Sequence, residues 1–387
     1  MRKTKLRLRF QIIAFTVARL VLNTGHRMVY PFLPTFARGL NVSQETVALA
    51  VTARSSLGLA GPVYGTLADA RGRKLAMMTG MASFGLGMLL VLLWPTYPAL
   101  FAGLLLGGIG KSLYDPAMQA YIGDRVHYTR RGTALAMTEL SWSGAFLLGM
   151  PLIGWLIARS DYWQAPFPLL AALALGSVGV LWLAVPSDAP QPGERPRFSD
   201  GLRVVARHPV ALAGISVGFL ISGANEVISI VYGAWMEDAF ALKVTALGAT
   251  SIVIGIAELT SEGAVAGMVD RLGKRRAVVL GIGSNAAASL LLPLTGFSVG
   301  GAMVGLFVFF LTFEFAMVSL IPLLTELVPQ ARATVMAGSS AAMAAGRMVG
   351  ALVGTYLFRL GLVANGGTAA LMNVVALVVI LWFIKQE

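Results

Sequence analysis

Eleven ionisable side chains lie inside long apolar stretches of this 387-residue sequence. A charge in a hydrocarbon surrounding costs several kcal/mol unless it faces protein, water or a partner. Residues kept at such a cost are typical of a site that binds a charged ligand or moves protons. The embedded basic residues are Arg19, Arg27, Arg54, Lys111 and Arg347, and the embedded acidic residues are Asp115, Glu139, Glu226, Glu258, Glu262 and Glu314.

These charges are distributed unevenly along the chain. In the first half four cations oppose two carboxylates, a balance of +2, and in the second half four carboxylates oppose one cation, a balance of −3. The pattern predicts a cavity for a substrate whose anionic group faces the first half. The predicted cavity residues are Arg27, Arg54, Lys111, Asp115, Trp142, Glu226, Glu314 and Arg347, with Trp142 as a residue that would stack on the substrate.

Carboxyl groups in this cavity are candidates for carrying protons. Burial in a low-dielectric surrounding favours the uncharged form of a carboxyl group, so it can gain and lose a proton during a working cycle. The proton-coupling candidates are Glu226, Glu314, Glu258, Asp115 and Glu139.

Structural ion pairs are the alternative interpretation of several embedded charges. Lys111 and Asp115 are four residues apart, so they would neutralise each other on one helix face. Arg19 would pair with a nearby acid as a link between helices. Glu139 would bond to the loop that precedes its helix, and Glu262 would form a salt bridge at the cytoplasmic end of its helix.

Membrane-spanning helices are the elements expected to position these side chains. Hydrophobic residues make up 57% of the chain and charged residues only 12%, with a mean hydropathy of +0.76. A water-soluble surface requires roughly a quarter of its residues to be charged, so the solvent of this chain is a bilayer. Apolar runs long enough to cross it number twelve, at residues 10–33, 45–68, 75–94, 98–122, 133–157, 165–185, 209–234, 244–267, 277–294, 299–323, 333–356 and 367–384.

The basic residues predict how these spans are oriented. The connections on one side, together with both ends of the chain, carry 21 Lys and Arg residues, and the other side carries only Arg38, Arg159, Lys243 and Arg359. Positive charge accumulates on the cytoplasmic side of a membrane, so we expect a multi-pass protein of the cytoplasmic (inner) membrane of a prokaryote with both termini in the cytoplasm. The same asymmetry accounts for the net charge of +12 without a nucleic-acid partner.

The two halves of the chain resemble each other at a constant offset of 201 residues. This register places Asp69 on Asp270 and Gly72 on Gly273. Two parallel repeats around a site at the middle of the bilayer are typical of secondary transporters. The predicted domains are an N-terminal six-helix bundle at residues 1–185, a polar, proline-rich cytoplasmic linker at 186–208 and a C-terminal six-helix bundle at 209–387.

Residues 65–74, Gly-Thr-Leu-Ala-Asp-Ala-Arg-Gly-Arg-Lys, resemble the loop signature of the major facilitator superfamily, and residues 267–275 resemble its second copy. The resemblance implies an all-α membrane fold of twelve helices in two pseudo-symmetric bundles. It also implies that the signature acts in the conformational switch, for which the matching positions are Gly65, Asp69, Gly72, Arg73, Lys74, Asp270 and Gly273.

Two further features bear on this resemblance. In the family, helices 3, 6, 9 and 12 face lipid, and none of the eleven embedded charges falls in the corresponding spans. Residues 149–154 are similar in part to an element of the family's antiporters, which favours the branch of proton-coupled antiporters and exporters. Leu104 stands where many drug exporters of the family carry a functional arginine, so their proton-coupling scheme does not carry over directly.

Enzymatic chemistry is not indicated by any motif. Residues 107–112 are similar to a phosphate-binding loop, but Leu105 stands where that motif requires glycine, inside an apolar helix. The sequence has no cysteine and no zinc-binding or dinucleotide-binding pattern. We therefore expect no enzyme activity, no metal site and no cofactor, with a proton gradient as the driving force.

The expected function is secondary active transport by alternating access, with proton-coupled export of amphipathic small molecules. Two alternatives stay open: a lipid or glycolipid flippase of the same fold, and a proton-coupled importer of organic anions. The expected partners are a small-molecule or lipid-like substrate and the bilayer, and the expected state is a monomer.

Overall fold

The structure is a computed structural model that describes residues 2–61, 64, 72–186, 205 and 207–384. Every regular element in this part of the chain is a helix, which confirms the predicted all-α class. Gly65, Asp69 and most of the predicted linker lie outside the described residues.

The helices are α1 (Arg2–Arg27), α2 (Val29–Leu40), α3 (Gln44–Ser56), α5 (Arg73–Leu93), α6 (Tyr97–Arg125), α7 (Tyr128–Gly144), α8 (Met150–Ser160), α9 (Pro166–Ala184), α11 (Pro209–Ser229), α12 (Tyr232–Phe240), α13 (Val244–Leu272), α14 (Lys274–Leu291), α15 (Val299–Leu327), α16 (Arg332–Phe358) and α17 (Leu362–Phe383). Four short helical turns join some of them: η1 (Leu57–Ala60), η2 (Ala145–Gly149), η3 (Leu292–Thr295) and η4 (Pro329–Ala331).

Nine helical segments in the described part of the chain are long and apolar enough to cross a membrane. They correspond to nine of the twelve predicted spans. The other three predicted spans, 10–33, 45–68 and 98–122, contain embedded charges, and their crossing of the bilayer stays a prediction.

The contacts divide the chain into two compact units. Unit 1 comprises Met1–Ser43, Ala60–Gly193 and Val244–Ile252, and unit 2 comprises Gln44–Leu59, Glu194–Lys243 and Val253–Glu387. Helix α3 therefore belongs to unit 2, although the residues before it belong to unit 1. The first residues of α13 belong to unit 1, although the rest of that helix belongs to unit 2.

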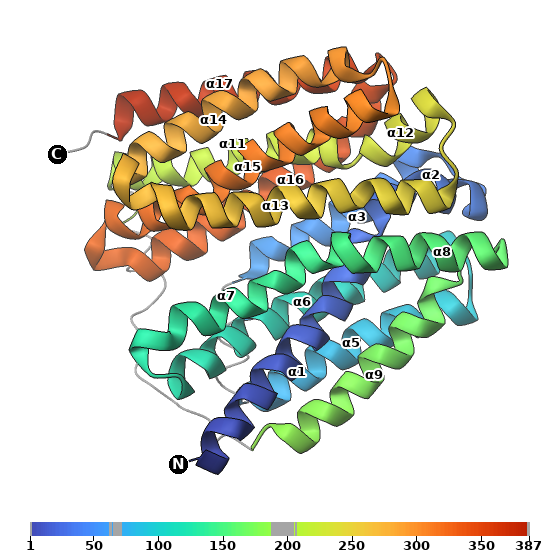
Figure 1. Cartoon of the computed structure of the whole chain (residues 1–387), viewed down its shortest axis with the longest axis horizontal. Coiled ribbons are helices and arrows are strands. Elements are labelled where there is room, and N and C mark those ends of the chain that lie inside the picture. Colours follow the sequence, from blue (N-terminus) through green and yellow to red (C-terminus); the bar gives the residue numbers. More distant parts are fainter. Residues whose placement is uncertain (1, 62–63, 65–71, 187–204, 206, 385–387) are drawn as a thin grey trace. The chain divides into compact units, whose positions relative to one another are not determined.

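Unit 1 is built on close packing of α5 with α6 and α9, and of α1 with α7 and α9 (Figure 1). Glycine pairs let α5 and α6 approach closely, because a Cβ atom at Gly80 would lie 2.7 Å from the Gly110 carbonyl oxygen. A Cβ atom at Gly87 would lie equally close, 2.7 Å, to the Gly103 carbonyl oxygen. The hydrophobic driving force between helices is weak in lipid, so helices associate largely through the close packing that small residues permit.

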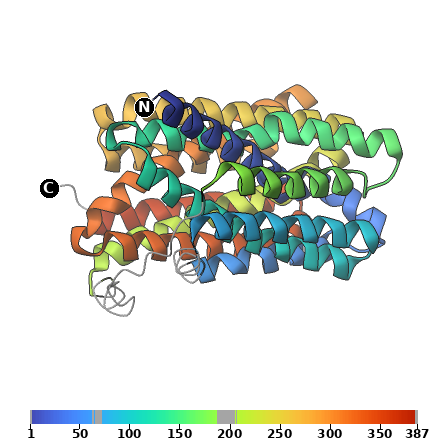
Figure 2. The same ribbon diagram turned by 90° about the horizontal axis from the view of Figure 1, so that it is seen from below.

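Unit 2 is organised around α11, which packs on α16 and α17, while α14 packs on α15 and α17 and α3 packs on α16. In the view of Figure 2, as in Figure 1, the long helices of this unit run beside one another. A stripe of glycines on α16 faces α11, and a Cβ atom at Gly350 would lie 2.7 Å from the Gly223 carbonyl oxygen. The crossing is therefore tight enough to require glycine at this position.

Several of the predicted continuous spans are interrupted in the described part of the chain, and the interruptions of three spans lie near embedded charges. The first breaks at Met28 between α1 and α2, and the seventh breaks at Ile230–Val231 between α11 and α12. The fifth contains the π-helical turn η2 between α7 and α8. Such interruptions depend on how neighbouring helices satisfy the freed backbone groups, which hydrophobic pattern alone does not reveal.

The offset repeat in the sequence corresponds to a repeated local structure. Gly72 and Gly273 each precede a helix, at the N-termini of α5 and α14, with φ values of 90° and 82°. L-residues rarely adopt this backbone conformation, which explains glycine at both positions. The next residue then forms an ion pair with an acid near the end of a later helix: Arg73 with Asp124, and Lys274 with Glu326.

Candidate functional site

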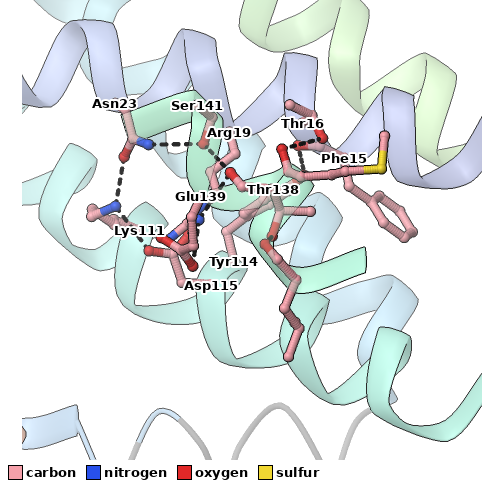
Figure 3. Close-up of polar contacts among 12 residues, drawn as sticks. Phe15, Thr16, Arg19, Asn23, Lys111, Tyr114, Asp115, Thr138, Glu139 and Ser141 are labelled. Carbon is pink, nitrogen blue, oxygen red and sulfur yellow. Dashed lines mark hydrogen bonds and ion pairs between the residues drawn. The ribbon is translucent and has the colours of Figure 1, made fainter. Parts of the chain in front are cut away.

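Arg19 is the centre of an ion-pair cluster in unit 1 that joins three helices. From α1 its Nε lies 3.1 Å from Asp115 Oδ1 on α6, and its Nη1 lies 2.8 Å from Glu139 Oε1 on α7. The same Nη1 donates to the Thr138 carbonyl at 3.1 Å. The Arg19 side chain is buried, and Figure 3 shows it directed between the two carboxylates. This arrangement confirms the interpretation of Arg19 as a link between helices.

Lys111 extends the cluster to the next turn of α1. Its Nζ donates to Asp115 Oδ2 at 2.8 Å and to Asn23 Oδ1 at 2.6 Å. Asn23 Nδ2 donates in turn to Ser141 Oγ at 3.2 Å, and Ser141 Oγ donates to the Thr138 carbonyl at 2.6 Å. The predicted pairing of Lys111 with Asp115 is therefore present, within a larger network (Figure 3).

The sequence places these groups through simple helical spacing. Arg19, Asn23 and Arg27 are four residues apart, so they follow one face of α1. Two cations, Arg19 and Lys111, balance the two carboxylates of the cluster. Charged side chains in hydrocarbon are tolerated when they pair in this way.

Glu139 differs from one of its predicted roles. It pairs with Arg19 on α1, so the interpretation of Glu139 as a partner of the preceding loop is wrong. Its side chain is 43% exposed, whereas that of Asp115 is 18% exposed. Glu139 therefore forms the accessible edge of the cluster and Asp115 its interior.

Arg27 lies one turn beyond this network, between two aromatic rings. Its Cζ lies 4.1 Å from the centre of the Trp142 ring and 3.6 Å from the centre of the Phe146 ring. Nη1 donates to the Trp142 carbonyl at 3.1 Å. Aromatic faces attract a guanidinium, so the two rings and this hydrogen bond hold the Arg27 side chain in one orientation.

The π-helical turn η2 begins three residues after Trp142 and contains Phe146. At its end the Met150 N–H donates to the Ala145 carbonyl, five residues back. Any side chain at Gly149 would collide with Thr24, so glycine lets this turn approach α1. Single π-helical turns are frequent at functional sites.

The predicted acids of the second half lie in unit 2. Glu226 on α11, Glu258 on α13 and Glu314 on α15 are 1%, 2% and 9% exposed. Glu262 is half-buried. A Cβ atom at Gly350 would lie 2.7 Å from that of Glu226, so Glu226 lies beside the close crossing of α11 and α16.

The cations of unit 2 lie on two other helices. Arg54 is buried on α3, which packs on α16, and Arg347 is half-buried on α16 itself. In unit 1, Arg19, Lys111, Asp115 and Glu139 are brought together into one cluster. Asp270 is exposed in the last turns of α13.

Three participating residues were missed in the sequence: Asn23, Ser141 and Phe146. Asn23 lies four residues from both Arg19 and Arg27, and Phe146 lies four residues after Trp142, so helical spacing was a usable signal for both. Ser141 had no such signal, because its role depends on which face of α7 meets α1. Among the described residues, no group of three or more His, Cys, Asp or Glu side chains could hold a metal ion.

Comparison with known proteins gives a consistent result. The family model of the Major Facilitator Superfamily matches residues 15–331. The "Uncharacterized MFS-type transporter YceJ" of Bacillus subtilis (strain 168) is 23% identical over 351 residues, which cover 90% of this chain and 89% of the relative. "Multidrug resistance protein 2" of the same strain is 22% identical over 347 residues, which cover 87% of this chain and 86% of the relative.

A solved structure shows the same fold. The crystal structure of a POT family transporter in complex with a thioalcohol-conjugated peptide aligns with a TM-score of 0.78, at 15% identity, covering 96% of this chain and 95% of that chain. At this level of identity the likeness supports the architecture alone.

Proposed function

Because this chain belongs to the Major Facilitator Superfamily, a family of membrane transporters rather than enzymes, we propose that it exports amphipathic small molecules in exchange for protons. Transport would proceed by alternating access, with the substrate bound among the embedded charges. The multidrug resistance relative named above supports the choice of an exporter.

The observation that carries the proposal is the environment of Arg27. Arg27 is stacked between Trp142 and Phe146, next to the cluster of paired charges around Arg19. A guanidinium held in this way is oriented to receive an anionic group along its edge. The two rings offer an apolar surface to the rest of the substrate, so the site suits an amphipathic molecule with an acidic group.

Protons are proposed to be carried mainly by Glu226 and Glu314. Both are buried carboxyl groups on helices of unit 2, with Glu258 as a further candidate. Asp115 is a weaker candidate than the sequence alone suggests, because protonating it would break ion pairs with both Arg19 and Lys111. Glu139, with one cation partner and an exposed carboxylate, stays a candidate.

The proposed cellular setting follows from the charge distribution along the chain. The protein would lie in the cytoplasmic membrane with both termini in the cytoplasm, because the basic connections lie on that side. It would work as a monomer, without a cofactor, on the energy of the proton gradient. Gly72, Arg73, Lys74, Asp270 and Gly273 would take part in the conformational switch.

Reconstituted vesicles test this function directly. Purified protein in proteoliposomes would be given a pH gradient, and movement of a dansylated carboxylate amphiphile would be followed. Glu226→Gln and Glu314→Gln are each expected to abolish transport driven by the pH gradient. Exchange of labelled for unlabelled substrate, measured at equal pH on both sides, is expected to remain intact.

The matched control is Asp161→Asn at an exposed helix end, because asparagine also accepts the left-handed conformation found there, with φ of 57°. This variant is expected to transport normally. Gradient-driven transport that survives in both glutamate variants would exclude these two residues as proton carriers.

Import of organic anions is a second candidate, and the stacked Arg27 is the observation that favours it. The two candidates share the binding site and differ in direction. An inward proton gradient would drive extrusion by an antiporter and accumulation by a symporter, so the sign of the flux in the same vesicles decides between them.

A further inference from the structure

Two basic side chains make the same unusual contact at equivalent places in the two units. Lys74, in the first turn of α5, donates from Nζ to the Trp182 carbonyl at 2.7 Å, near the end of α9. Arg275, in the first turn of α14, donates from Nη2 to the Leu381 carbonyl at 3.4 Å, near the end of α17.

The two acceptor carbonyls occupy the same position relative to their helix ends. The N–H that caps α9 bonds to the Leu181 carbonyl, and the next carbonyl receives Lys74. The N–H that caps α17 bonds to the Ile380 carbonyl, and the next carbonyl receives Arg275. The last carbonyls of a helix lack partners and carry partial negative charge, so a cation is held there in a defined orientation.

The cation one position before each of these two residues is paired with a carboxylate. Arg73 and Lys274, one residue earlier, pair with Asp124 and Glu326 respectively. Neither Lys74 nor Arg275 forms an ion pair with a carboxylate of the described residues. The buried Nε of Arg275 has no hydrogen-bond partner in the described part of the chain. Lys74 and Arg275 each have further N–H donors beyond the one that meets the helix-end carbonyl.

An exposed tryptophan stands at or next to each acceptor carbonyl in the sequence. Trp182 on α9, whose carbonyl accepts from Lys74, is 63% exposed. Trp382, next to Leu381 on α17, is 73% exposed. Tryptophan is enriched where a membrane protein meets the lipid headgroups. A cation beside an interfacial tryptophan is the arrangement expected where the phosphate of a lipid sits.

We propose that each unit binds the phosphate of an anionic phospholipid at this position, one lipid at Lys74 with Trp182 and one at Arg275 with Trp382. The phosphate would accept the remaining N–H donors of the cation, and the tryptophan would pack on the glycerol region. The inference does not depend on the transported substrate, because these residues are separate from the Arg27 site.

Native mass spectrometry of the purified full-length protein tests this proposal. Detergent-solubilised protein would be titrated with phosphatidylglycerol and, in parallel, with phosphatidylcholine of the same acyl chains. We expect two phosphatidylglycerol molecules to be retained by the unsubstituted protein, one by K74Q or R275Q, and none by the double variant. Each lost site should bind at least about fivefold more weakly.

Three controls make the result specific. Lys243→Gln removes an exposed cation from the start of α13 and should retain both lipids. Lys74→Arg keeps the charge and should also retain both. Each variant is checked for an unchanged unfolding temperature in phosphatidylcholine. Equal retention of the two lipids, or two phosphatidylglycerol molecules on the double variant, would overturn the proposal.

Discussion

Arg19 and Asp115 lie 96 residues apart in the sequence, yet the Arg19 Nε and the Asp115 Oδ1 are 3.1 Å apart. Around this contact Lys111 and Glu139 complete a cluster whose charges cancel. The cluster fixes the faces that α1, α6 and α7 turn toward one another. It thereby positions Arg27, two turns further along α1, and Trp142, one turn further along α7, where the proposed substrate group binds.

Removing one partner of this cluster is expected to destabilise the protein strongly. Arg19→Gln leaves Glu139 without its cation and leaves Asp115 with Lys111 as its remaining partner, and breaking a buried pair in this way costs about 3–5 kcal/mol. Arg359→Gln is the matched control, because its pair with Glu45 is largely exposed on the arginine side. It should cost less than about 1 kcal/mol. Unfolding temperatures in detergent measure both.

The double variant Arg19→Gln with Asp115→Asn is expected to lose less stability than the two single variants together. Each single change leaves a charge without its partner, and the double change removes that pair. A coupling free energy of about 1–3 kcal/mol is typical of residues in one network. Strictly additive losses would mean that the contact contributes nothing to the folded state.

Arg27 is expected to control affinity rather than folding. Arg27→Gln should weaken binding of an anionic amphiphile by about tenfold, equal to the loss of about 1.4 kcal/mol. Arg27→Lys keeps the charge but loses the planar stacking and the paired donors, so it should restore binding only in part. Quenching of tryptophan fluorescence by the dansylated carboxylate amphiphile measures the affinity. Full affinity in Arg27→Gln would place the anionic group elsewhere.

The crossing of α11 and α16 is expected to tolerate no side chain at Gly350. Gly350→Ala places a Cβ atom 2.7 Å from both the Gly223 carbonyl oxygen and the Glu226 Cβ, so overpacking should cost about 1–3 kcal/mol. Gly263→Ala on α13 meets nothing within 4 Å and should be neutral or stabilising by up to about 1 kcal/mol. Thermal unfolding of the two variants side by side checks the contrast.

The fold class was predictable because the bilayer imposes a simple rule on composition. Long apolar runs with few charges must be helices, since no water satisfies the backbone in lipid. The repeat was also readable, because Gly72 and Gly273 are required by the same backbone conformation. The pairing of Lys111 with Asp115 followed from their spacing on one helix.

Other features were beyond reach of the sequence because they depend on how helices are rotated against each other. Nothing in the pattern shows that Glu139 turns toward α1 rather than toward the preceding loop. The π-helical turn at Ala145–Gly149 depends on the closeness of Thr24. The contacts of Lys74 and Arg275 join the start of one helix to the end of another, so no local spacing predicts them.

Cysteine labelling from each side of the membrane tests the central claim, that the embedded charges serve a site reached alternately from both sides. The sequence contains no cysteine, so a single Trp142→Cys substitution reports without interference. Phe167→Cys, at a fully buried position, is the negative control. A membrane-impermeant thiol reagent should label position 142 from either side of sealed vesicles, and a pH gradient should change the ratio of the two rates. Labelling from neither side, at the rate of the buried control, would show a dry seam of structural ion pairs and contradict the account.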